Sequence, residues 1–129
     1  MLIGNSGNDS LNGGTGNDRL IGGAGTDAFV FNAALGGGNS DRIVDFSVIN
    51  DTVRLENAIF TGLANGVLAA SAFTANLTGL ATDALDRIIY DSDTGNLFFD
   101  ADGTGAGARV QFAVLAANLA LTNADFLVI

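Results

Sequence analysis

Aspartates at a fixed spacing are the residues of this chain best suited to chemistry. Asp9, Asp18 and Asp27 are nine residues apart, and each closes a short loop that begins with glycine. Ca²⁺ prefers carboxylate and backbone carbonyl oxygens, which it gathers in sets of about six to eight. Glycine tolerates positive φ, so the loops can turn their carbonyls inward. The pattern therefore predicts loops that bind Ca²⁺.

The loops belong to a nine-residue phrase that occurs in three consecutive copies, Gly4–Asn12, Gly13–Ile21 and Gly22–Val30. Each copy continues after its aspartate with a short extended segment that has Leu, Leu or Phe at the same offset. Ordinary turns or a flexible linker would account for the Gly, Asn and Asp content, but neither would place a large apolar residue in register. A nine-residue step is half a coil, so loops eighteen residues apart should stack.

The phrase G-G-x-G-x-D-x-U-x, with U a large apolar residue, is similar to the calcium-binding repeat of RTX proteins. This resemblance implies a parallel β-roll in which each ion takes one aspartate from each of two stacked loops. It implies that Asp9 and Asp27 share a Ca²⁺. The downstream partner of the Asp18 loop should fall near Phe31–Gly36, where the phrase has decayed, or a ligand should come from Gly36–Asp45.

The resemblance makes the three aspartates and their loops the predicted metal-binding residues. They are Asp9, Asp18, Asp27, Gly4, Asn5, Ser6, Gly7, Gly13, Gly14, Thr15, Gly16, Gly22, Gly23, Ala24 and Gly25. Further candidate ligands are Asp41, Asp45, Asp100 and Asp102. Surface pairing with Arg42 or Arg54 is the alternative for the first two. An ordinary Asp-Gly turn is the alternative for the last two, because the terminal Glu and flanking helices of an EF-hand are absent.

The amino-acid composition narrows the classes of function that this chain can have. The 129 residues suit one domain, or one with a small appendage. The net charge is −9, with five basic residues, no His and no Cys. This excludes thiol nucleophiles, Ser-His dyads and the usual zinc sites, and it makes nucleic acid and anionic membranes improbable partners. No apolar run is long enough to span a bilayer. Because the repeats begin abruptly and no signal peptide precedes them, we expect the C-terminal part of a longer protein.

The predicted fold is all-β: a short parallel β-roll over residues 1–32, then a β-sandwich-like sheet domain over 33–129 with one or two short helices. Alternating polar and apolar residues and turn signals predict the later elements. These are strands within 41–46, 51–55 and 108–115, a helix over 68–73, a loop over 74–84, a hairpin over 86–100 turning at 92–95, and a capped helical turn at 122–125.

Residues 41–129 resemble the C-terminal domain of serralysin-type exoproteins. The resemblance rests on Asp-Arg-Ile-Val-Asp-Phe, Asp-Arg-Ile-Ile-Tyr-Asp, Asp-Ala-Asp-Gly-Thr-Gly-Ala-Gly and the Asp-Phe-Leu-Val-Ile end. It implies a secreted bacterial protein whose uncleaved signal for a type I (ABC-transporter) exporter includes Asp125, Phe126, Leu127, Val128 and Ile129. A closing edge strand is the plainer interpretation of these residues, and both can hold.

The leading functional hypothesis is a non-catalytic module that folds on Ca²⁺ after export. A polysaccharide-binding accessory module is the alternative, and the acidity disfavours a polyanion unless Arg19, Arg42 and Arg54 gather on one face. An enzyme with Asp91 and Asp100 as a glycosidase pair is the third hypothesis. It is weakest, because the chain has one Glu, no His and no catalytic motif.

Calcium titration followed by circular dichroism, with reversal by EGTA, tests the assignment. Asp27→Ala should abolish the first calcium-induced transition, because its loop stacks on that of Asp9. Asp102→Ala should leave this transition largely intact. Equal behaviour of the two variants would contradict the assignment.

Overall fold

The computed structural model describes residues 1–105 and 107–129, and its regular structure is almost entirely β-strand. One sheet has seven strands in the order β1-β3-β5-β11-β10-β9-β8, and the other has five in the order β2-β4-β6-β12-β7. This confirms the predicted all-β fold class. The strands are β1 (Leu2–Ile3), β2 (Ser10–Leu11), β3 (Arg19–Ile21), β4 (Ala28–Phe31), β5 (Asp41–Ile43), β6 (Thr52–Leu55), β7 (Gly66–Val67), β8 (Phe73–Asn76), β9 (Ile88–Asp91), β10 (Asn96–Phe99), β11 (Val110–Val114) and β12 (Phe126–Val128).

The first four strands form two stacked coils of a parallel roll. Leu2 pairs with Leu20 in one sheet, and Ser10 pairs with Ala28 in the other, so equivalent residues are eighteen apart. The apolar residue of each phrase points inward: Leu11 is 3% exposed, and Leu20 and Phe29 are fully buried. Extended residues alternate between the two faces of a strand, so one apolar residue per short strand is enough to line the core.

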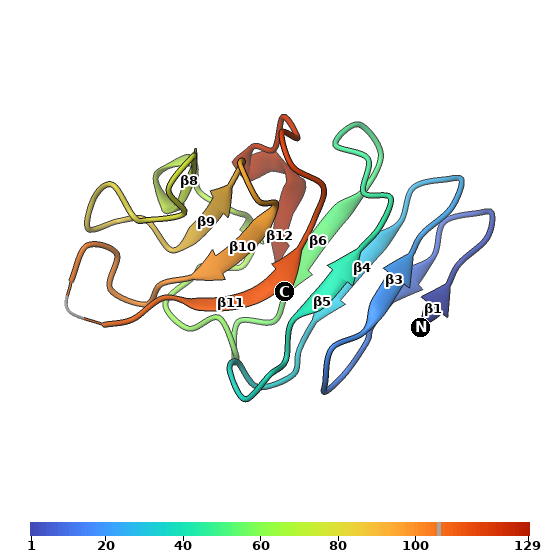
Figure 1. The fold of residues 1–129 in the computed structure, drawn as a ribbon, viewed down its shortest axis with the longest axis horizontal. Helices are drawn as coiled ribbons and strands as arrows, with labels where there is room; N and C mark the ends of the chain where they lie inside the picture. Colours follow the sequence, from blue (N-terminus) through green and yellow to red (C-terminus); the bar gives the residue numbers. More distant parts are fainter. Residues whose placement is uncertain (106) are drawn as a thin grey trace.

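Both sheets continue beyond the repeats. β5 pairs in parallel with β3, and β6 pairs in parallel with β4. Figure 1 shows β1, β3 and β5 side by side, with β4 and β6 in the second layer. The domain boundary expected after residue 32 stays a prediction. The strands β5 and β6, which form the third coil of the roll, continue both sheets beyond that residue.

The C-terminal segment adds one strand to each sheet, next to the third coil. β11 pairs in parallel with β5, and β12 pairs in parallel with β6. The last strand of the chain therefore lies between β6 and β7, one strand in from the edge of its sheet. β7 is antiparallel to β12 and forms the edge of that sheet.

The remaining elements extend the seven-stranded sheet. The hairpin β9–β10 is antiparallel, as the sequence predicts. Two expectations were wrong: the helix expected over 68–73 is a single 3₁₀ turn, Ala70–Ala72, and the loop expected over 74–84 begins with strand β8. β8 pairs in parallel with β9, and the ring of Phe73 lies 5.3 Å from that of Phe126. These distant partners leave no signal in the local sequence. The turn expected at 122–125 is the 3₁₀ turn Asn123–Asp125, and Thr122 caps it.

An aromatic cluster joins the roll to the later strands. The ring of Phe112 lies 5.3 Å from that of Phe31 and 4.9 Å from that of Phe60, in edge-to-face orientations. Phe99 contacts Phe60 in the same way, at 5.4 Å. Tyr90 holds the segment that follows β11, because its hydroxyl donates a hydrogen bond to the Ala116 carbonyl and accepts one from the Leu119 N–H. The core thus lies where all these elements meet.

Phe112→Ala should therefore destabilise the calcium-saturated chain by about 3–5 kcal/mol, because it leaves a cavity among buried rings. Urea unfolding at fixed Ca²⁺ measures this loss. Ile49→Ala is the control, since Ile49 is 88% exposed, and it should change the free energy of unfolding by less than about 0.5 kcal/mol. Similar losses in the two variants would contradict the central position of Phe112.

Candidate metal centre

Aspartate carboxylates bridge successive coils along both edges of the roll. On one edge the Asp9 N–H donates to Asp27 Oδ1, and the Asp27 N–H donates to Asp51 Oδ1, each at 2.9 Å. On the other edge the Asp18 N–H donates to Asp41 Oδ1 at 2.9 Å. Each bond fixes one carboxylate oxygen and aligns a loop with the next. Asp9 and Asp18 take part in these bonds through their N–H groups, and Asp27 takes part through both its N–H group and its Oδ1.

One carboxylate oxygen of each repeat aspartate has no partner among the described residues. The Oδ2 atoms of Asp9, Asp18 and Asp27 are buried and accept no hydrogen bond. An ionised carboxylate that is removed from water without a compensating partner loses several kcal/mol. A bound cation would supply that partner, so the orphaned oxygens fit a metal ion.

The first glycine of each phrase opens space for the ion. A Cβ on Gly4 would lie 2.5 Å from Asp9 Oδ2 and 2.6 Å from the Gly22 carbonyl oxygen. Both distances are shorter than the 3.0 Å below which real Cβ contacts essentially never occur. A carboxylate of one loop and a carbonyl of the next therefore converge on the point that glycine leaves empty. These are the two oxygen types that Ca²⁺ prefers.

On the opposite edge, two carboxylates converge. A Cβ on Gly13 would lie 2.6 Å from Asp41 Oδ2 and 2.9 Å from Asp18 Oδ2. Asp41 is 5% exposed. Burial raises the pKa of the Asp41 carboxyl; the hydrogen bond from the Asp18 N–H opposes this shift and the charge of Asp18 adds to it. The pair repels unless a proton or a cation lies between the oxygens.

The partner of the Asp18 loop is not the expected stretch Phe31–Gly36. The Gly16 N–H donates to Asn39 Oδ1 at 2.6 Å, and the Ser40 N–H donates to Asn17 Oδ1 at 2.9 Å. The offset between Asp18 and Asp41 is 23 residues, in place of the eighteen of the repeat. Extra residues between β4 and β5 shift the register, so the second carboxylate comes from the alternative range that ends at residue 45.

Asp45 has a different role from Asp41. Its Oδ1 accepts the Gly22 N–H at 2.9 Å, and its Oδ2 accepts the Gly23 N–H at 2.8 Å. The side chain is exposed. It therefore holds the start of the third repeat loop through backbone amides and adds negative charge beside that loop.

Asp100 and Asp102 stabilise a turn of their own. Asp102 Oδ2 accepts the Gly107 N–H at 2.7 Å, and Asp100 Oδ1 accepts the Asp102 N–H at 3.3 Å. Burial raises the pKa of Asp100, whereas the Gly107 hydrogen bond lowers the pKa of Asp102. Asp91 lies at the other end of the hairpin, where its Oδ1 accepts the Asp93 N–H. Asp91 therefore lies away from the turn that Asp100 and Asp102 stabilise.

Asp51 is the functional candidate that the sequence reasoning missed. It is 7% exposed, and its Oδ2 accepts the Ser47 N–H at 2.9 Å. One signal was available: Asp51 directly precedes a strand, as Asp9, Asp18 and Asp27 do. The surrounding residues lack the glycines of the phrase, so the motif alone did not identify it.

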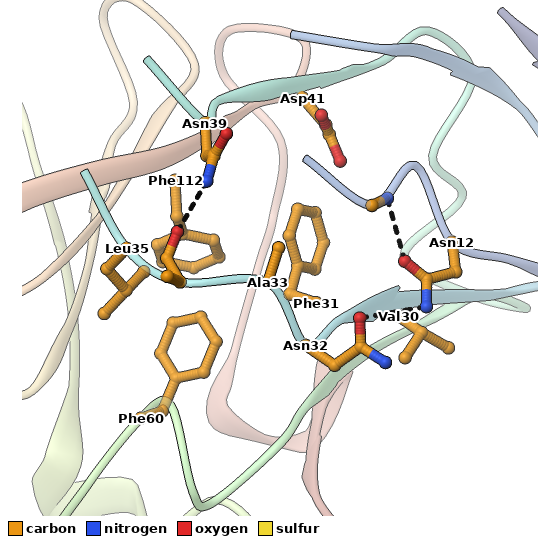
Figure 2. Close-up of a pocket in the computed structure, with 12 residues that line it drawn as sticks. Asn12, Val30, Phe31, Asn32, Ala33, Leu35, Asn39, Asp41, Phe60 and Phe112 are labelled. Atoms are coloured by element: carbon orange, nitrogen blue, oxygen red, sulfur yellow. Dashed lines mark hydrogen bonds between the residues drawn. The ribbon is translucent and has the colours of Figure 1, made fainter. Parts of the chain in front are cut away.

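A small pocket joins the Asp41 edge to the aromatic cluster. Figure 2 shows Asn12 and Asn32 on one side of it, Asn39 and Asp41 on another, and aromatic rings below. The Asn12 side chain donates to Asn32 Oδ1 at 3.0 Å, and that of Asn39 donates to the Ala34 carbonyl at 2.7 Å. Asp41 thus lines the same small pocket as Phe31, Phe60 and Phe112 of the aromatic cluster.

Among the described residues, no three His, Cys, Asp or Glu side chains form a metal-binding group. A bound ion would take one or two carboxylates at each site together with loop carbonyls. A parallel roll whose loops hold buried carboxylate oxygens without a hydrogen-bond partner has the architecture of a calcium-binding β-roll.

Residues 2–33 match the family model of the RTX calcium-binding nonapeptide repeat (4 copies). Residues 2–33 therefore carry RTX calcium-binding repeats, and Ca²⁺ is the ion that such repeats bind. No curated protein matches the chain. Within the described residues, no helix has the length and apolar character needed to cross a membrane.

The space beside the first glycines can be tested by filling it. Gly13→Ala should reduce the calcium affinity of the Asp18–Asp41 site by tenfold or more (about 1.4 kcal/mol or more), because the methyl group would occupy the ion's position. Isothermal titration calorimetry measures the affinity. Gly62→Ala is the matched control: Gly62 lies outside the repeats, its φ is +85°, and nothing lies within 4 Å of the added Cβ. It should strain the backbone while leaving the ion's space open, and an equal loss of affinity would contradict the proposed position.

Proposed function

We propose that this chain is a non-catalytic, calcium-dependent folding module of a larger secreted protein, and that it folds after type I (ABC-transporter) export. The observation that carries this proposal is the set of buried carboxylate oxygens without a partner between the coils of the roll. RTX repeat proteins are typically secreted, which agrees with the proposal.

Electrostatics supports the dependence on calcium. The chain carries a net charge of −9, and folding aligns several of its carboxylates along two edges. Glycine-rich loops also lose much conformational entropy when they are ordered. Ca²⁺ would neutralise the carboxylates, and because the unfolded chain has no preformed site, its binding free energy would become folding free energy.

The candidate ligands are placed where they can affect the rest of the fold. Asp41 begins β5, and Asp51 directly precedes β6. These two strands are the ones on which β11 and β12 pair. Ion binding at the loops would therefore order the platform that the C-terminal strands need.

The fate of the C-terminal residues agrees with export before folding. Phe126 and Val128 are buried, and Asp125 Oδ2 accepts the Thr122 N–H at 2.8 Å within the capped turn. A signal made of Asp125–Ile129 would be largely hidden in the folded chain. It would be accessible to an exporter while the cytosol, which is poor in free Ca²⁺, keeps the chain unfolded.

The polysaccharide-binding alternative gains limited support. Arg19 and Arg42 are exposed register partners on β3 and β5, whereas Arg54 lies in the other sheet. The three arginines do not form one basic face. Asp91 and Asp100, at opposite ends of the hairpin, likewise offer no support for a glycosidase pair.

Hydrogen exchange followed by mass spectrometry tests the coupling. With millimolar Ca²⁺, the amides of residues 110–114 and 126–128 should be protected. With excess EGTA they should exchange at least a hundredfold faster, because β11 and β12 lose the ordered strands beside them. Mg²⁺ at the same concentration is the control and should not restore protection, since it demands near-octahedral geometry and dehydrates reluctantly. Unchanged protection in EGTA would refute calcium-dependent folding.

A further inference from the structure

Asp27 has a buried carboxylate oxygen that the repeat assignment does not explain. It is the aspartate of the last repeat, and the family match ends at residue 33. It is 1% exposed, and its Oδ2 has no hydrogen-bond partner. An aspartate that only completed the site of the preceding loop would not need a second buried oxygen without a partner.

The two oxygens of Asp27 are used in different directions. Oδ1 reaches back to the first coil, where it accepts the Asp9 N–H. Oδ2 packs against Gly22, because a Cβ there would lie 2.9 Å from Asp27 Cγ and closer still to Oδ2. Asp9 packs against Gly4 in the same way, and there its Oδ2 meets the carbonyl of the following coil. By equivalence with Asp9, Asp27 Oδ2 would face the next coil, which is formed by β5 and β6.

That coil presents the loop Asp45–Asp51, which lies outside the repeats. The pairing of Leu20 with Ile43 leads directly to Asp45, whose carboxylate oxygens accept the N–H groups of Gly22 and Gly23. Asp51 Oδ1 accepts the Asp27 N–H, as Asp27 Oδ1 accepts the Asp9 N–H. The hydrogen-bonded ladder thus continues by one layer into a loop that lacks the phrase.

We propose a further Ca²⁺ site between Asp27 and the loop Asp45–Asp51. Asp27 Oδ2 supplies the buried carboxylate oxygen, loop carbonyls supply neutral ligands, and Asp51 supplies the second negative charge. This inference rests on the calcium-binding role proposed above. It makes Asp27 a bridge between two ions on one edge, while the Asp18–Asp41 site lies on the other.

The same geometry ends the series at Asp51. Both Asp51 oxygens accept N–H groups, from Asp27 and from Ser47. In the repeats, the corresponding Oδ2 has no donor because the loop is glycine-rich and open. Asp51 therefore closes the ladder, and we expect one ion for each of the three orphaned oxygens.

Native mass spectrometry and anomalous diffraction of the full chain with Ca²⁺ provide the test. The wild-type chain should bind three ions, one of them coordinated by Asp27 Oδ2 and by the 45–51 loop. Asp51→Asn should bind one ion fewer, because it removes the charge opposite Asp27 while its amide oxygen can still accept the Asp27 N–H. Asp93→Asn is the matched control: Asp93 is exposed in the turn of the β9–β10 hairpin, and this variant should keep all three ions.

The outcomes separate this inference from the proposed function. Ions at Asp9 and at Asp18–Asp41, with none between Asp27 and the 45–51 loop, would overturn the further site and leave the calcium-binding roll intact. No bound ion at all would overturn both. If Asp51→Asn does not fold, diffraction from the wild-type crystals alone decides, because the position of the third ion is read directly.

Discussion

The fold depends on how negative charge is held between coils of backbone. Asp27, Asp41 and Asp51 each use one carboxylate oxygen to accept an N–H from the preceding coil, and this bond holds the carboxylate at the edge of the roll. The other oxygen of Asp27 is buried without a donor, as is one oxygen of Asp9 and one of Asp18. Coulomb interactions are stronger away from bulk water, so both the repulsion between carboxylates and the attraction of a divalent cation are amplified there. The same contact that aligns the coils thus creates the need for the ion.

Glycine has two separate functions in this arrangement. Gly14 and Gly16 have φ of +77° and +99°, so they provide a backbone conformation that most residues avoid. Gly4 and Gly13 have no positive φ; they provide space, because a side chain there would enter the position where carboxylate and carbonyl oxygens converge. A phrase that mixes both kinds of glycine encodes the turn and the ion's position together. This explains why the loop 45–51 can continue the ladder of hydrogen bonds but cannot continue the series of open sites.

Local pattern was enough to predict the repeats, the inward residues Leu11, Leu20 and Phe29, the β9–β10 hairpin and the Thr122 cap. Each of these follows from residues close together in the sequence. The partners of Asp18 and Asp27 in the third coil were harder, because offsets of 23 and 24 residues replace the regular step of eighteen. Strand β8 and the parallel pairing of β12 with β6 gave no sequence signal at all. Parallel pairing joins segments that are remote in the chain, so neither composition nor periodicity can indicate which strands meet.

Phe126 pairs with Val53, and Ala113 with Asp41, so about seventy residues separate the strands that close the fold. Closing such a loop costs entropy before any contact is gained. The entropic cost is larger if β5 and β6, which are both short strands, must be ordered at the same time as the loop closes. Each begins at or directly after an aspartate that bonds to the preceding coil. An ion held at these aspartates would order the two strands locally, before the long loop closes. The C-terminal strands would then add to an existing surface, and the buried aromatic cluster around Phe112 would form last.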